Sequence, residues 1–127
     1  MRMMTLLALC CALCLSAAPV GRAAQQKPFH TEGVFSNITA GPEGDYGGMQ
    51  VYLTDSDGQF YAVVTVAQGV LLPPVLVKVK ADVEARRIEF ELPGSDGPRK
   101  FKGTVTADGL TLEEDGERHV LKRKCYD

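Results

Sequence analysis

The chain has 127 residues, of which 45% are hydrophobic and 24% are charged, and its formal net charge is −2 at pH 7. This length and balance predict a single globular domain with a modest hydrophobic core. A mildly acidic chain argues against nucleic acid as a partner, because binding to phosphates needs a basic surface.

The first 23 residues have the pattern of a secretory signal peptide, with Arg2 at the start, an apolar stretch over 5–20 and small residues at its end. Cleavage after Ala23 fits better than cleavage after Ala24, which would put Arg22 where a small side chain is needed. The apolar stretch is shorter than the ~20 residues of a membrane span. We therefore expect an exported protein, periplasmic or secreted, that keeps no stable membrane span after cleavage.

The cysteines fit this interpretation. Cys10, Cys11 and Cys14 lie within the signal segment, where we interpret them as apolar filler, since no second set of metal ligands with suitable spacing accompanies them. After cleavage Cys125 is the one cysteine left in the chain. It cannot form an internal disulfide, so we expect either a free thiol or an intermolecular disulfide that links a dimer. No metal site is predicted.

Residues 24–32 are expected to form an extended leader, and 33–127 a single domain. From Gly33 onward, apolar and polar residues alternate with period two between turn signals, which predicts strands and no helix. The segment AGPEGDYGG at 40–48 predicts a flexible loop. The expected strands are eight short runs at 33–39, 48–55, 59–67, 75–82, 87–92, 99–106, 110–114 and 118–124.

The turn signal Asp57-Gly58 joins the second and third of these runs. A two-residue turn at this point fixes the register of the hairpin. The expected apolar pairs are Leu53–Ala62, Val51–Val64 and Met49–Val66.

The next connection, GVLLPP at 69–74, is apolar where a polar turn is usual. Two interpretations stay open for Val70, Leu71 and Leu72. They either plug one end of the domain, or they form an exposed patch that serves a protein partner, a lipid or the entrance for a ligand.

The segment VLVKVKADVEARRIEFEL at 75–92 gives the clearest hairpin signal, with its turn at Glu84 and Ala85. In this register one face is apolar and the other carries opposite charges, each pair worth about 0.2–1 kcal/mol. The expected apolar pairs are Ala81–Ile88, Val79–Phe90 and Val77–Leu92, and the expected charge pairs are Asp82–Arg87, Lys80–Glu89 and Lys78–Glu91.

Two further turn signals organise the end of the chain. Asp108-Gly109 is expected to place Val105 opposite Leu112, and Asp115-Gly116 is expected to bring His119, Leu121 and Arg123 onto the inner face. His119 and Arg123 are candidate ligand contacts on that apolar face, although we favour a structural role for Arg123 at the rim, packed on an aromatic ring such as Phe35.

Tight connections predict a meander, and eight such strands can close into a small barrel that leaves no exposed edge. A two-layer β-sandwich is the alternative. Gly33-Val34-Phe35 on the first strand and Arg123 on the last resemble the lipocalin and wider calycin pattern, in which a Gly-x-Trp packs under a basic residue. Here Phe35 stands in place of the tryptophan. The resemblance implies an eight-stranded barrel and specifies no ligand.

No nucleophile motif or phosphate loop is found, and the acidic residues Glu113, Glu114 and Asp115 are expected to be solvated at a hairpin tip. We therefore expect a non-enzymatic binding protein without a cofactor. In one hypothesis the lumen holds a small apolar or amphipathic ligand, with 70–72 at its mouth. The small inward residues Ala62, Ala81 and Gly103 would leave room for it.

In the other hypothesis the barrel is solid. Its surface or rim then binds another protein, as small exported inhibitors do.

Overall fold

A computed structural model describes residues 30–125, so the predicted signal peptide and the first part of the leader lie outside the described residues. Within this range the chain is all-β, and none of it forms a helix that is long and apolar enough to cross a membrane. Its strands are β1 (Gly33–Ser36), β2 (Thr39–Ala40), β3 (Tyr46–Ser56), β4 (Gln59–Leu71), β5 (Val75–Asp82), β6 (Arg87–Leu92), β7 (Arg99–Val105), β8 (Gly109–Glu114) and β9 (Glu117–Lys124).

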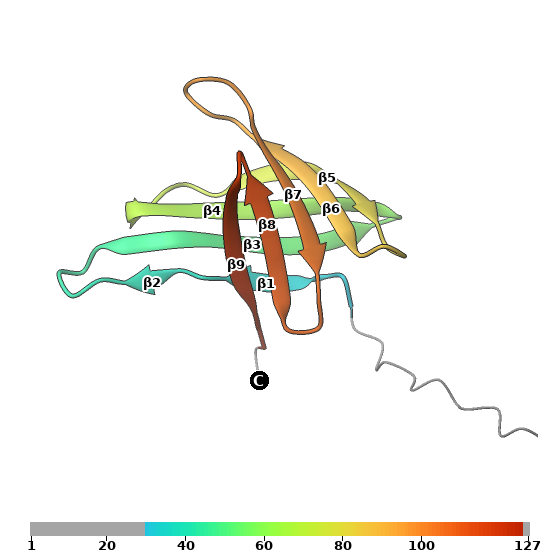
Figure 1. Ribbon diagram of the computed structural model, residues 1–127, viewed down its shortest axis with the longest axis horizontal. Helices are drawn as coiled ribbons and strands as arrows, with labels where there is room; N and C mark the ends of the chain where they lie inside the picture. The colour runs from blue at the N-terminus through green and yellow to red at the C-terminus, as the bar shows by residue number, and fades with distance from the viewer. Residues whose placement is uncertain (1–29, 126–127) are drawn as a thin grey trace, which may run out of the picture.

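Eight of these strands form a closed antiparallel barrel, which confirms the predicted fold class over the sandwich. The ring runs β1-β9-β8-β7-β6-β5-β4-β3, and β1 closes it by pairing with β3. From β3 to β9 each strand pairs with its neighbour in the chain, as a meander requires. In Figure 1 the strands β7, β8 and β9 cross in front of the long β3–β4 hairpin, while β2 extends the sheet outside the ring.

The first predicted strand is divided in two at Asn37. The side chain of this residue forms a hydrogen bond with the backbone of β3 and interrupts the regular strand pairing there. Asn37 N donates a hydrogen bond to Met49 O (3.1 Å), and its Oδ1 accepts one from Met49 N (2.7 Å). After this break β2 pairs with the start of β3, Thr39 opposite Gly47. The expected loop at 40–48 therefore shrinks to 41–45.

The β3–β4 hairpin has the predicted register, with Met49 opposite Val66 and Leu53 opposite Ala62. Asp57 and Gly58 make the turn, with φ angles of 52° and 80°. Both angles are positive, as a tight turn that matches the strand twist requires. β4 continues to Leu71, beyond its expected end at 67.

Every strand of the ring contributes to the core, from Phe35 on β1 to Leu121 on β9. The rings of Phe90 and Phe101 stack with centroids 5.1 Å apart. Gly103 does not leave room for a ligand, and that expectation is wrong. A Cβ atom on it would lie 2.7 Å from Leu112 Cδ2, so the space is already filled.

The last two hairpins differ in how well turn chemistry predicts them. Asp115-Gly116 sets Glu114 opposite Glu117, as expected. Val105, however, pairs with Leu110 and not with Leu112. The turn lies one residue earlier than the signal suggested, because Thr106 N donates to Gly109 O (2.8 Å) and Thr106 Oγ1 accepts from Gly109 N (3.1 Å).

Candidate functional site: a seam between β5 and β6

The barrel wall has a weakly paired seam between β5 and β6. Their ladder holds three residue pairs beside the turn, Lys80–Glu89, Ala81–Ile88 and Asp82–Arg87, which agree with the predicted register. The predicted continuation is wrong, because Val79–Phe90, Val77–Leu92 and Lys78–Glu91 do not pair. Away from the turn each strand follows its other neighbour, β5 pairing with β4 and β6 with β7, so the two strands separate.

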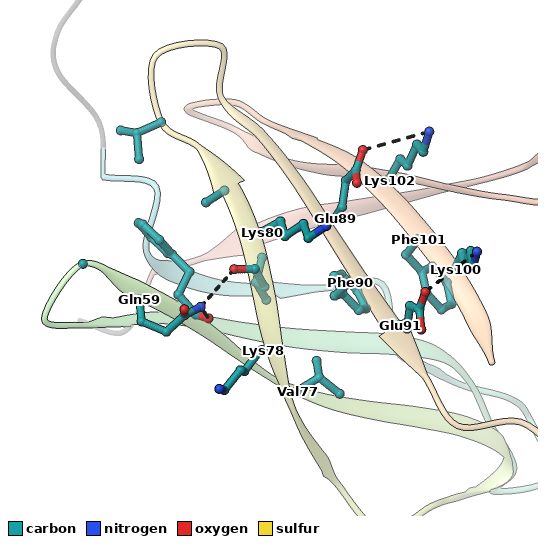
Figure 2. A pocket seen from close by; sticks show the side chains of 15 residues that line it. Gln59, Val77, Lys78, Lys80, Glu89, Phe90, Glu91, Lys100, Phe101 and Lys102 are labelled. Carbon is teal, nitrogen blue, oxygen red and sulfur yellow. Dashed lines mark hydrogen bonds and ion pairs between the residues drawn. The ribbon is translucent and has the colours of Figure 1, made fainter.

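A groove of about 880 Å³ lies along this seam (Figure 2). Its apolar lining residues are Phe60, Val77, Val79, Ala81, Val83, Phe90 and Phe101. Val79, Phe90 and Phe101 belong to the core and are 3%, 4% and 1% exposed. The floor of the groove is therefore formed by residues that also belong to the core of the barrel.

One end of the groove is bordered by the β3–β4 turn. Gln59 lies here, and its Nε2 donates hydrogen bonds to Phe60 O (2.8 Å) and Val79 O (3.2 Å). This side chain thus ties the start of β4 to β5 beside the seam.

Charged side chains border the groove, and the lysines outnumber the glutamates by two. Glu91 faces Lys100 of β7 (3.9 Å between Oε1 and Nζ), and Glu89 faces Lys102 (4.0 Å). The ion pairs of both glutamates are thus made with lysines of β7, although Glu89 is also the strand partner of Lys80 on β5. The charged residues that line the groove are Lys78, Lys80, Lys100, Lys102, Glu89 and Glu91.

A second groove of about 540 Å³ lies along β6 to β9. Most of its lining is polar or charged, with Thr104, Thr111 and Arg118 among its residues. Small-molecule sites in proteins are mostly apolar with a few polar groups, and the seam groove fits that description better.

The predicted binding residues at 70–72 lie elsewhere. Val70, Leu71 and Leu72 are 63%, 53% and 38% exposed, so they do not plug the barrel, and that interpretation is wrong. Leu72 N donates to Val66 O (2.9 Å), which turns the chain at the end of β4. None of the three lines either groove.

Arg123 has the expected place at the rim. Its guanidinium carbon lies 4.7 Å from the centroid of Phe35. Its nitrogens also donate to four backbone carbonyls, those of His30, Glu32, Thr106 and Ala107. It therefore joins the leader and the β7–β8 turn to the end of β9, and it does not line either groove.

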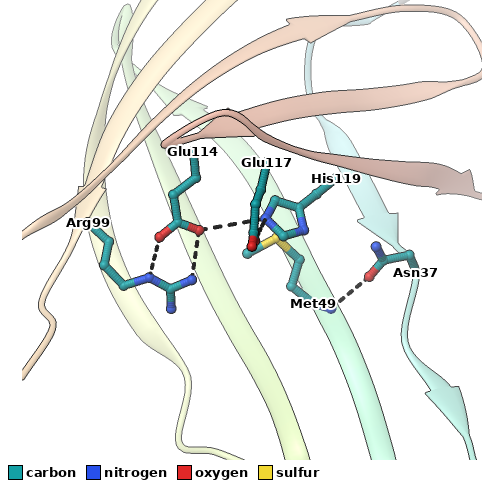
Figure 3. A network of polar contacts seen from close by, with 6 residues as sticks. All are labelled: Asn37, Met49, Arg99, Glu114, Glu117 and His119. Atoms are coloured by element: carbon teal, nitrogen blue, oxygen red, sulfur yellow. Dashed lines mark hydrogen bonds and ion pairs between the residues drawn. The ribbon is translucent and has the colours of Figure 1, made fainter.

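His119 faces inward as predicted and belongs to a polar cluster that sequence reasoning missed (Figure 3). Glu114 accepts two hydrogen bonds from Arg99, at 2.6 and 2.8 Å. His119 Nε2 is shielded from solvent and lies 3.6 Å from Glu114 Oε2 and 3.9 Å from Glu117 Oε2. Because both Glu114 oxygens are held by Arg99, the arrangement favours a structural role over acid–base chemistry.

The side chain of Glu114 is 11% exposed, so its predicted solvation is wrong. The hydrogen bonds from Arg99 lower the pKa of the Glu114 carboxyl, and its hydrogen bond raises the pKa of Arg99. The signal was in the sequence, because period two places Glu114 on the same face as Leu110 and Leu112.

Two other predictions can be placed. Cys125 is an exposed free cysteine, with the thiol that an intermolecular disulfide requires. Among residues 30–125 no three His, Cys, Asp or Glu side chains are grouped to hold a metal ion.

Comparison of the chain with protein-family models, with curated proteins and with solved structures finds no significant match. The barrel and the seam groove are therefore the basis for the functional proposal.

Proposed function

We propose that this chain is an exported, non-enzymatic binding protein that holds a small amphipathic molecule in the groove along the β5–β6 seam. The observation that carries the proposal is the contact between this groove and core residues. A ligand with an apolar part needs an apolar surface to cover, and the core residues Phe90 and Phe101 at the floor of the groove supply one.

The size and chemistry of the groove support the proposal. Its volume of about 880 Å³ falls within the ~300–1,000 Å³ of typical small-molecule sites. Its apolar surface lies inside a rim of charged side chains, and this combination matches a ligand that has both an apolar and a polar part. Burying the apolar part stabilises the complex by about 25 cal/mol per Å².

Native mass spectrometry of the exported protein, purified without detergent, tests the proposal. We expect an additional mass that is lost on denaturation. Decanoate serves as a probe ligand in calorimetric titrations. Val77→Trp, which fills the groove, is expected to remove the additional mass and to weaken decanoate binding at least about tenfold, equivalent to about 1.4 kcal/mol.

Leu76→Trp is the matched control. Leu76 is the preceding residue on the same strand, is 67% exposed and does not line the groove. This variant should bind as the parent does. A parent protein that carries no additional mass and binds no decanoate contradicts the proposal, as does a folded Val77→Trp variant with parental affinity.

The exposed aliphatic side chains of Val70, Leu71 and Leu72 favour a second candidate function, which is binding of a protein partner. Changing Leu71 and Leu72 to serine would abolish such binding and leave decanoate binding intact. Cross-linking of the exported protein in its native compartment, with this double variant as the control, tests this candidate.

A further inference from the structure

We infer that the ligand of the seam groove is anionic, with its head group held by Lys78 and Lys80 at the outer rim and its apolar tail passing through the seam to Phe90 and Phe101. This inference rests on the proposed function and specifies the class of ligand. A single-chain amphiphile with a carboxylate or another acidic head has the required chemistry.

The alternation of β5 places the two kinds of contact on opposite faces of the barrel wall. Val79 is buried and Val77 is half-buried, while Lys78 and Lys80 between and beside them are exposed. On the side of Lys80 away from the turn, residues 75–79 of β5 have no pairing partner on β6. A molecule that lies across this free strand edge therefore meets apolar side chains inside the wall and ammonium groups outside it.

Lys78 and Lys80 are also the lysines of the groove that form no ion pair within 4.0 Å inside the described part of the chain. Lys100 and Lys102 each lie within 4.0 Å of a glutamate, whereas among residues 30–125 no carboxylate lies so close to Lys78 or Lys80. Of the expected β5–β6 charge pairs, Lys80–Glu89 and Asp82–Arg87 are strand partners and Lys78–Glu91 is not, while the ion pairs of Glu89 and Glu91 are made with β7. Two ammonium groups next to an apolar groove favour an anion there.

The charge at this rim is opposite in sign to the net charge of the chain. The chain has a formal net charge of −2, yet the groove carries two more lysines than glutamates. The local excess of positive charge attracts a negatively charged group, so the rim favours an anionic head over a neutral or cationic one.

Three unbranched probes that each contain a chain of ten carbon atoms test the inference: decanoate, decan-1-ol and decyltrimethylammonium. Calorimetric titration at low salt, below the micelle-forming concentrations, is expected to give the tightest binding for decanoate and the weakest for the cation. Lys78→Gln/Lys80→Gln should weaken decanoate about tenfold, since two exposed ion pairs contribute up to about 1 kcal/mol each. Binding of decan-1-ol to this variant should be unchanged.

Lys122→Gln/Lys124→Gln is the matched control. It removes the same charge from exposed positions on β9, on the far side of the ring from β5, and should leave all three affinities unchanged. Equal affinities for the three probes, or a Lys78→Gln/Lys80→Gln variant that binds decanoate like the parent, would overturn the inference but leave the groove as an apolar site. If none of the probes binds the parent, the proposed function itself fails.

Discussion

At the scale of single residues, Arg123 shows how one side chain can hold distant parts of the chain together. Its planar guanidinium lies over Phe35 and donates to carbonyls of the leader and of the β7–β8 turn. Lysine cannot reproduce this set of contacts, because it has a single ammonium group and no planar fork.

Arg123→Ala is expected to lower the free energy of unfolding by about 2 kcal/mol. The variant loses several hydrogen bonds of about 1 kcal/mol each and a cation–π contact of about 0.5–1 kcal/mol, partly replaced by water. Arg123→Lys should recover less than half of this loss. Urea unfolding followed by circular dichroism measures both values, with Lys124→Ala as the exposed control. Unchanged stability of Arg123→Ala would show that the rim contacts do not hold the barrel.

The cluster of Arg99, Glu114 and His119 makes the stability of the fold depend on pH. The Glu114 carboxyl has a lower pKa in the folded state than in the unfolded chain, because Arg99 donates two hydrogen bonds to its charged form. The unfolded state therefore binds more protons in acid. The stabilisation is present above the ordinary pKa of the group and is lost as the pH falls through the folded-state pKa.

Glu114→Gln is therefore expected to cost about 1–2 kcal/mol at neutral pH, because hydrogen bonds to charged groups are lost. It should also lose stability less steeply than the parent as the medium is made acidic. Urea unfolding midpoints over a pH series measure both effects. The neighbouring Glu113→Gln, at an exposed position, should follow the parent curve. A Glu114→Gln curve parallel to that of the parent would contradict the assignment.

At the scale of elements, hairpin registers were predictable where turn chemistry and alternation agree. Asp57-Gly58 and Asp115-Gly116 both supply the positive φ angles that tight turns need, and their registers are as predicted. The register predicted from Asp108-Gly109 is wrong because the hydroxyl group of Thr106 forms hydrogen bonds with the backbone of Gly109 and so fixes a turn one residue earlier. A sequence pattern does not show which of two overlapping turns the backbone will adopt.

The seam could not be predicted from the β5–β6 sequence alone. Its alternation is perfect for a full hairpin, but β5 must also follow β4, and β6 must also follow β7. Closing a ring sets the tilt and stagger of all its strands together, so a gap between one pair is a property of the whole barrel. This is why residues 70–72, His119 and Arg123 were predicted as binding residues and the groove-lining ones were not.

Hydrogen exchange should detect the seam directly. β5 and β6 share three residue pairs, whereas β3 and β4 share eleven. We expect amides in Val75–Val79 and Phe90–Leu92 to exchange faster than those in Met49–Leu53, because amides without a strand partner on one side open more easily. Decanoate should slow exchange at the seam. Equal protection of the three segments would mean that the wall is fully paired in solution.

At the scale of the whole molecule, one small barrel combines a closed ring of strands with a groove on its wall. Nearly every apolar side chain of the core comes from an inward position of a ring strand, and the ring is closed by the pairing of β1 with β3 and β9. The fold thereby gains stability from closure while one groove on its wall reaches core residues. Binding is the function that this combination supports best.

The oligomeric state is also a property at this scale. Cys125 is exposed after the last strand, so we expect exported protein to form a disulfide-linked dimer in an oxidising compartment. A non-reducing gel should show a dimer band that disappears with reductant and in Cys125→Ser. A monomer band alone, from protein kept in oxidising conditions, would show that the thiol stays free.

An NMR titration of the folded domain with decanoate shows whether the β5–β6 seam is the ligand-binding site. We predict saturable chemical-shift changes centred on Val77–Ala81 and Glu89–Glu91, with little change in Met49–Leu53. Shifts centred on Val70–Leu72, or no saturable change anywhere in the domain, would contradict the account.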